Sequence, residues 1–224
     1  MSGDPQRIMV SSRSGRVHVV ARPRHDVVVR GGDSTTDAAG VLTVDGGPSD
    51  RVEIECPEGT HVTVGASSGR VVLDGSFGDV RVTTSSGRVE IGRAVSVDVR
   101  SASGAVVVDD CAGECRVVAT SGRIEVGRAG SLVADNGSGR VVAGRVGGAV
   151  VHTGSGRIRI GADASSSLTV RSVSGAVEVD LPVGSTPAVH VVSTSGRTRS
   201  ECAPGTDGAV DIETVTGRID VRCR

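Results

Sequence analysis

One short pattern recurs along most of this chain: a serine or threonine is followed by glycine and then, in most copies, by arginine. The first copy is at Gly15. After an initial gap of 54 residues, the glycines follow one another at intervals of 17 to 21 residues. They are Gly69, Gly87, Gly104, Gly122, Gly139, Gly156, Gly175, Gly196 and Gly217. A period of this length is typical of stacked repeats, in which every repeat packs mainly on its two neighbours.

Between the glycines, apolar and polar residues alternate, as they do in strands that bury one face. The alternate positions before Gly87, which we expect to point inward, are Val80, Val82, Thr84 and Ser86. After the glycine the phase shifts by one residue, so that the inward positions become Val89 and Ile91. Each repeat therefore reads as a long strand, a tight corner at glycine and a second strand. Glycine suits such a corner because it adopts backbone angles that other residues reach only at a cost.

Composition agrees with a thin cross-section. The chain contains 33 glycines and no tryptophan or tyrosine, and Phe77 is its one aromatic residue. Because aromatic side chains supply much of the buried area in globular cores, a chain without them has to fill a narrow core with Val, Ile, Leu and Ala. We predict an all-β fold, specifically a parallel β-solenoid (β-helix-like) with coils of about 17–21 residues. Two strands per coil are expected, with a three-sided coil as the alternative.

The first quarter of the chain is less regular. We expect residues 1–55 to form irregular strands that cap the solenoid and residues 56–224 to form the regular repeats. Short strands are predicted at Val17–Val20, Val27–Val29, Val41–Val44 and Val52–Glu55. The gap between Gly15 and Gly69 would fit three coils with degenerate corners near Gly32 and Asp50.

The stretch from Cys56 to Val64, together with the Ser-Gly-hydrophobic repeats that follow it, resembles the bacterial β-strand-repeat adhesin family, a domain of unknown function. The resemblance covers roughly residues 50–224. It implies a β-repeat fold and an adhesin-like role. Members of that family often carry aspartate after the glycine, where this chain has arginine or alanine.

Stacked coils would align the arginines that follow the glycines, and such a ladder of like charges is repulsive unless acids or a bound anion compensate it. Some repeats supply an acid two residues later, such as Glu90 or Glu125. The anion-binding candidates, which lack one, are Arg140, Arg157, Arg159, Arg197 and Arg199. They could bind nucleic acid, teichoic acid or lipid head groups, or they could form a solvated edge that discourages aggregation. The lack of stacking aromatic residues argues against nucleic acid.

No catalytic, cofactor-binding or metal-binding motif is recognisable, so we expect no enzymatic activity, no cofactor and no metal. Five cysteines form an odd set without the rhythm of a disulfide framework, and Cys111 and Cys115 are expected to be buried thiols rather than a metal half-site or a disulfide across a turn. The polar first residues and the absence of a long apolar run predict no signal peptide and no transmembrane helix. Together these features predict a cytoplasmic location.

The leading functional hypothesis is a non-enzymatic scaffold that presents ordered rows of side chains to a protein partner or to itself. The alternative is an anion-binding module that uses the arginine-rich corner. The last repeat ends within a strand pattern, where Asp220 should point outward and Ile219 and Val221 should point inward without a neighbouring coil. Because an unpaired strand edge seeks other strands, the sequence predicts a homodimer through the C-terminal coil.

Overall fold

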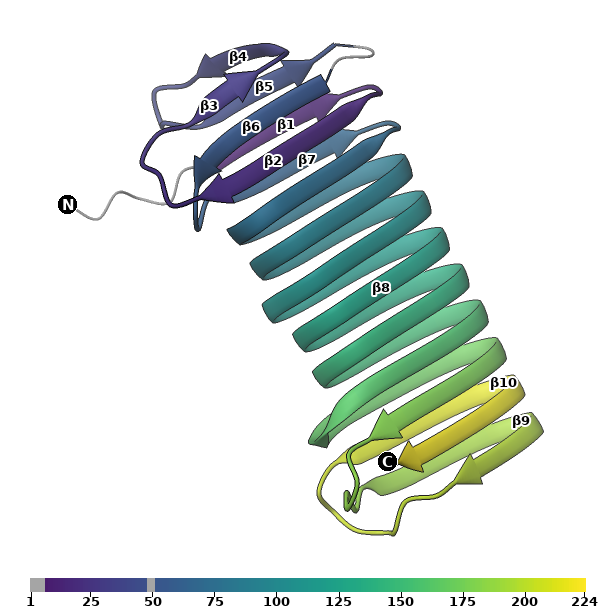
Figure 1. The fold of residues 1–224 in the computed structure, drawn as a ribbon. Helices are drawn as coiled ribbons and strands as arrows, with labels where there is room; N and C mark the ends of the chain where they lie inside the picture. The colour runs from purple at the N-terminus through teal and green to yellow at the C-terminus, as the bar shows by residue number, and fades with distance from the viewer. Residues whose placement is uncertain (1–6, 48–50) are drawn as a thin grey trace. The chain divides into compact units, whose positions relative to one another are not determined.

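The computed structural model describes residues 7–47 and 51–224, and the chain divides into two compact units, Met1–Ala112 and Gly113–Arg224. Ten strands make up the described residues, which contain no helix and therefore none that could cross a membrane. The prediction of an all-β chain is confirmed. Strand β8 (Arg70–Leu181) begins in the first unit and continues into the second, and it winds through successive turns in each (Figure 1).

The first unit contains seven further strands. They are β1 (Arg7–Ser12), β2 (Arg16–Arg22), β3 (Val28–Arg30), β4 (Asp33–Thr36), β5 (Leu42–Gly46), β6 (Arg51–Pro57) and β7 (His61–Ala66). β1 pairs in parallel with β5 on one side and β7 on the other, and β2 pairs in parallel with β6 and with the start of β8. In the stack, the turn formed by β1 and β2 therefore lies between the β5–β6 turn and the β7–β8 turn, although it comes first in the chain.

This arrangement explains the irregular start of the repeat. All four strands predicted before residue 56 are present, as β2, β3, β5 and β6. The prediction of three coils between Gly15 and Gly69 is wrong, because a Cβ added at Gly69 would lie 2.1 Å from the Gly15 carbonyl oxygen, so the two corners are direct neighbours. The intervening chain forms the β5–β6 turn and two antiparallel strands, β3 on β6 and β4 on β5.

Of the two degenerate corners expected in that segment, Gly32 falls between β3 and β4, where it adopts a φ of +79°. Asp50 lies outside the described residues. The division into a cap of residues 1–55 and repeats of 56–224 stays a prediction.

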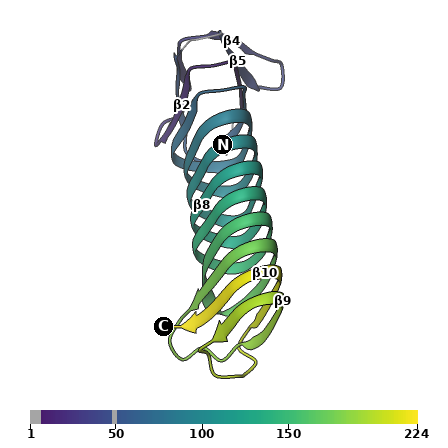
Figure 2. The ribbon, with the colours of Figure 1, turned by 90° about the vertical axis from the view of Figure 1, so that its right-hand side faces the viewer.

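In the second unit, too, the order of the coils in the stack differs from their order in the sequence. It contains the rest of β8, β9 (Ala188–Ser200) and β10 (Ala209–Cys223). β10 pairs in parallel with β8 over residues 167–181 and with β9 on its other side. The last strand of the sequence is thus inserted between β8 and β9, and β9 forms the outermost coil (Figures 1 and 2).

The corner glycines are stacked in register. In the second unit, added Cβ atoms at Gly139, Gly156 and Gly217 would each lie within 2.0 Å of the carbonyl oxygen of the glycine in the adjacent coil. φ is +126° at Gly139 and +135° at Gly156. Both the backbone angle and the close approach of the next coil therefore require glycine at these corners.

A hydroxyl group closes several corners from inside. The Oγ1 of Thr84 donates a hydrogen bond to the carbonyl oxygen of Ser86 at 3.0 Å, and the Oγ of Ser101 donates to that of Ser103 at 3.1 Å. Thr84 and Ser101 are buried, whereas Ser86, which was expected to point inward, is only half-buried. The structural hydroxyl thus stands three positions before the glycine, where its hydrogen bond satisfies a main-chain acceptor of the turn.

Candidate functional site

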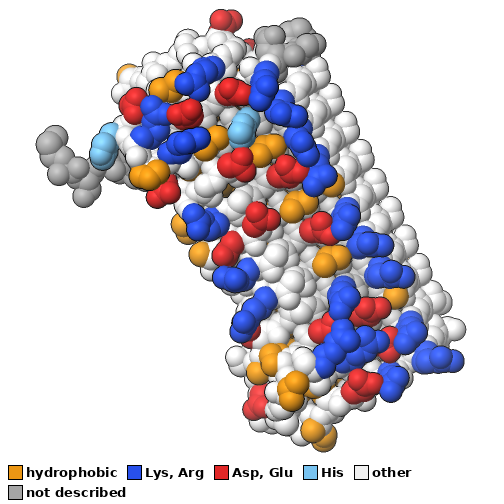
Figure 3. All heavy atoms as spheres, in the orientation of Figure 1, with side chains coloured by type: hydrophobic (Ala, Val, Ile, Leu, Met, Phe, Trp, Pro, Cys, Tyr) orange, Lys and Arg blue, Asp and Glu red, His pale blue; other side chains and the backbone are white. Residues whose placement is uncertain are grey.

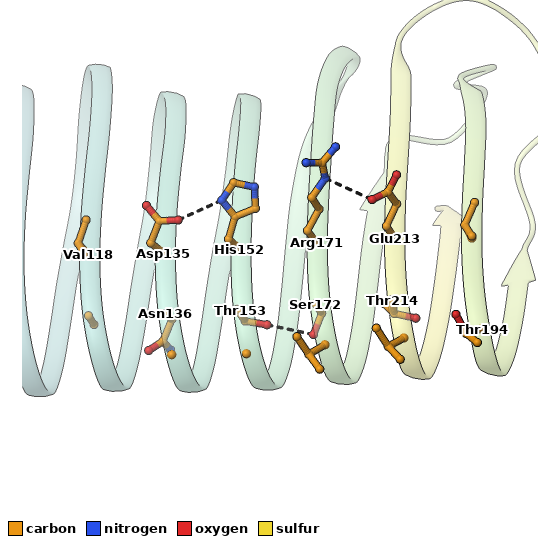
Figure 4. A pocket seen from close by; sticks show the side chains of 16 residues that line it. Val118, Asp135, Asn136, His152, Thr153, Arg171, Ser172, Thr194, Glu213 and Thr214 are labelled. Carbon is orange, nitrogen blue, oxygen red and sulfur yellow. Dashed lines mark hydrogen bonds and ion pairs between the residues drawn. The ribbon is translucent and has the colours of Figure 1, made fainter.

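A groove of about 600 Å³ crosses the stacked coils of the second unit on the strand arms that precede the corner glycines (Figure 4). Three rows of residues line it. One edge consists of Val118, Asp135, His152, Arg171, Glu213 and Val192. The floor consists of Ala119, Asn136, Thr153, Ser172 and Thr214. The other edge consists of Gly137, Gly154, Val173, Val215 and Thr194.

The first edge carries ionisable side chains that are paired between coils. The Nδ1 of His152 lies 3.0 Å from the Oδ1 of Asp135, and the Nε of Arg171 lies 3.3 Å from the Oε2 of Glu213 (Figure 4). All four side chains are partly exposed, so each pair contributes little to stability. Their main effect is to engage the ionisable side chains of this edge with one another.

The floor is polar and mostly satisfied internally. The Oγ1 of Thr153 donates to the Oγ of Ser172 at 3.1 Å, and the Oγ of Ser172 donates to the carbonyl oxygen of Ser174 at 3.3 Å. The exception is Asn136, whose side chain is 3% exposed. Its Nδ2 donates to the Gly122 carbonyl oxygen at 3.4 Å, but its Oδ1 is buried with no hydrogen-bond partner among the described residues. Such an unsatisfied buried acceptor is costly to stability.

The second edge is open and apolar. A Cβ at Gly137 would lie 2.4 Å from the Thr120 carbonyl oxygen, and one at Gly154 would lie 2.5 Å from that of Gly137, so neither position can carry a side chain. Further along the edge, Val173 is 59% exposed and Val215 is 50% exposed. Clustered exposed apolar side chains of this kind mark interaction surfaces.

The groove therefore combines exposed apolar side chains with ionisable side chains that are paired with one another. Its hydroxyl groups and ionisable side chains are mostly engaged with one another, which suits binding. Among the described residues, no group of three or more His, Cys, Asp or Glu side chains is placed to hold a metal ion.

Comparison with known families identifies the family of this chain. The family model described as Toastrack DUF4097 matches residues 6–221, nearly the whole chain. The chain belongs to the Toastrack DUF4097 family. No curated protein and no solved structure matches it. The family is a domain of unknown function, as the sequence resemblance implied, and the adhesin-like role stays an expectation.

The arginines predicted to bind anions do not form one cluster in this Toastrack domain. Arg159 pairs with Asp180 at 3.0 Å and Arg199 pairs with Glu201 at 2.8 Å. Arg140, Arg157 and Arg197 have no acidic partner among the described residues. Arg140 and Arg157 follow glycines of adjacent coils, whereas the coils of Gly175 and Gly217 separate Arg197 from them.

The acidic partners expected for other arginines of the ladder are present. Arg88 contacts Glu90, Arg123 contacts Glu125, and the Nε of Arg218 lies 2.6 Å from the Oδ2 of Asp220. Figure 3 shows basic and acidic side chains side by side on the face turned to the viewer.

The prediction that the last repeat lacks a neighbouring coil is wrong, although Ile219 and Val221 do point inward as expected. Ile219 and Val221 are fully buried at 0% exposure, because β9 covers β10 on the side that was expected to be open. Asp220, which was expected to point outward, is 3% exposed because it lies against Arg218. Among the described residues of the second unit, the open strand edge therefore belongs to β9.

The cysteines divide into two groups. Cys56, Cys111 and Cys115 are buried thiols, as predicted for the last two. Cys202 and Cys223 form a disulfide with a Cα–Cα distance of 5.2 Å, which the sequence analysis missed. Each stands six residues after its corner glycine, Gly196 or Gly217, and this shared position was the available signal. The disulfide removes the cysteine-based reason for expecting a reducing compartment.

Proposed function

We propose that this protein is a non-enzymatic β-solenoid scaffold whose groove binds an extended, uncharged segment of a protein partner. The observation that carries the proposal is the pair of exposed valines, Val173 and Val215, along one edge of the groove. A peptide segment supplies apolar side chains that can pack against Val173 and Val215. The ionisable side chains along the first edge are engaged with one another, which favours a ligand without net charge.

The proposed solenoid gives the groove its rigidity. Coils stacked through parallel ladders hold the successive residues of each row about 4.8 Å apart. A segment lying across several coils would meet side chains that are already in place, which lowers the entropy lost on binding. The volume of about 600 Å³ is in the usual range of binding clefts.

Peptide selection against the purified chain tests this function. We expect neutral peptides with apolar residues to bind, and we expect the double variant Val173→Asp/Val215→Asp to lose at least tenfold in affinity. The matched control is Val95→Asp, because Val95 is 57% exposed but lies in the first unit, outside the groove. Peptides that bind the groove variant as tightly as the wild type would refute the proposal.

A second candidate is anion binding at Arg140 and Arg157. These guanidinium groups belong to adjacent coils and have no acidic partner among the described residues, so a phosphate or sulfate could bridge them. Binding of heparin at about 10 mM salt, where screening extends over about 30 Å, should weaken in Arg140→Gln/Arg157→Gln and fall steeply with added salt. Arg88→Gln is the matched control, because Arg88 already contacts Glu90. Absence of binding by the wild type at this salt concentration would exclude the candidate.

A further inference from the structure

The outer edge of β9 is open from Val189 onward, whereas just before the strand the Gly205 N–H donates to the Pro187 carbonyl oxygen at 3.4 Å. Among the described strands, β9 pairs with β10 alone. Its hydrogen bonds to that side include the Ala188 N–H to the Gly208 carbonyl oxygen at 2.8 Å and the Glu201 N–H to the Val221 carbonyl oxygen at 2.9 Å. Successive residues of a strand turn their N–H and C=O groups to opposite sides. The residues that direct these groups away from β10 are therefore Val189, Val191 and Ser193 on the first arm and Thr198 and Ser200 on the second.

The end of the core is open at the same place. A cavity of about 380 Å³ lies between the two arms of β9, lined by Val189 and Val191 on one side and by Thr198 and Ser200 on the other. In the paired coil, the positions of Thr198 and Ser200 are occupied by Ile219 and Val221, which are fully buried. The outermost coil thus offers both unpaired main-chain groups and a half-apolar inner face.

The outermost coil of the first unit is protected in a way that β9 is not. There, β5 and β6 are covered by β4 and β3, which are antiparallel strands of four and three residues. Very short edge strands discourage further pairing. Head-to-tail stacking would require an open edge at both ends, so a single long open edge favours a symmetric contact that closes on itself.

We propose that a second copy of this chain occupies the open edge, with the two β9 strands paired antiparallel about a two-fold axis. In a pairing centred on Val191, that residue faces its own counterpart and Val189 faces Ser193 of the second copy. All of these residues turn their main-chain groups to the open edge, which is the condition for hydrogen-bonded antiparallel pairs.

The second arm fits the same axis. Val191 stands five residues before Gly196 and Ser200 stands four residues after it, so the two residues lie at similar distances from the corner. A two-fold axis that crosses both arms of the coil can therefore pass close to both residues. Centred on Ser200, the pairing places Arg199 opposite Glu201 of the other copy. Two cross-strand pairs of opposite charge then flank the axis and favour this contact.

Sedimentation of the full chain over a concentration series tests the proposal. The wild type should form a dimer that does not grow further. Val191→Pro removes an N–H that points away from β10 and leaves the hydrogen bonds to β10 in place, as proline is tolerated on a strand edge. We expect it to raise the dimer dissociation constant at least tenfold. The control Val191→Ala keeps the N–H and should remain dimeric.

Amide hydrogen exchange of the wild type provides a second measurement that does not depend on the folding of the proline variant. Exchange at Val189 and Val191 should slow as the protein concentration rises. A wild type that stays monomeric, a wild type that forms open polymers, or a proline variant that folds and dimerises equally well would each overturn the proposal. The groove variant Val173→Asp/Val215→Asp should dimerise normally, so the outcome is separable from that of the proposed function.

Discussion

Gly139 is the position at which one added methyl group has the best-defined effect. Its φ is +126°, and a Cβ there would lie 2.0 Å from the carbonyl oxygen of Gly122 and 2.9 Å from its carbonyl carbon. The strained backbone costs about 1–3 kcal/mol. Forcing the adjacent coil to move costs about 1–3 kcal/mol more, since the obstructing atoms are main-chain atoms of a stacked strand. We therefore expect Gly139→Ala to destabilise the protein by about 4 kcal/mol.

A second glycine separates the two contributions. Gly184 also has a positive φ, +84°, but an added Cβ there meets no atom within 4 Å. Gly184→Ala should cost only the backbone strain, about 1–2 kcal/mol. Urea unfolding followed by circular dichroism gives both values. If the two variants are equally stable to within about 0.5 kcal/mol, which is near the precision of such comparisons, the stacked corner at Gly139 is refuted.

Two further predictions concern the C-terminal end of the chain. The disulfide joins Cys202 to Cys223 across a separation of 21 residues, so its reduction should lower the free energy of unfolding by about 2–4 kcal/mol. A reducing agent should therefore lower the melting temperature of the wild type but not that of Cys202→Ser/Cys223→Ser. Equal sensitivity of both proteins would contradict the disulfide. Burial raises the pKa of Asp180, but hydrogen bonds from Arg224 and Arg159 outweigh it and hold that pKa below its ordinary 3.8. The stability that the Asp180 carboxylate contributes is therefore complete above about pH 5 and is lost as the pH falls through the lowered pKa. The difference in melting temperature between wild type and Asp180→Asn should be constant from about pH 5 to 7 and shrink below about pH 4. A difference independent of pH would contradict this account.

Much of the fold could be predicted because the glycine repeat reports a local requirement. Each corner needs a backbone angle and a close approach that only glycine allows, so the period is visible in the sequence. The alternation around it then identifies the buried positions, such as Val89 and Ile91, both of which are 1% exposed.

The order of the coils could not be predicted from the same pattern. Ile219 and Val221 are as apolar as Val177 and Val179, with which they pair, so periodicity alone does not show which coil is outermost. Polar residues at inward positions, Thr198 and Ser200, mark the outermost coil once the register is known.

The groove depends on that order and was therefore missed. Asp135, His152 and Arg171 are 17 and 19 residues apart and could have been assigned to one row. Their continuation to Glu213 and then to Val192 runs backwards along the chain, which only the insertion of β10 explains. The missing partner of the Asn136 Oδ1 depends on atomic positions that no sequence pattern reports.

Both proposals require β10 to lie between β8 and β9, and cysteine cross-linking tests this order directly. Arg218 is in register with Ala176 of β8 and with Arg197 of β9. Adjacent coils are about 4.8 Å apart and alternate coils about 9.6 Å apart, whereas a disulfide spans Cα atoms up to about 7 Å apart. Under mild oxidation, with the linked peptides identified by mass spectrometry, Ala176→Cys/Arg218→Cys should form a disulfide and Ala176→Cys/Arg197→Cys should not. A bond in the second pair and none in the first would show that the coils follow the order of the sequence and would contradict the structure.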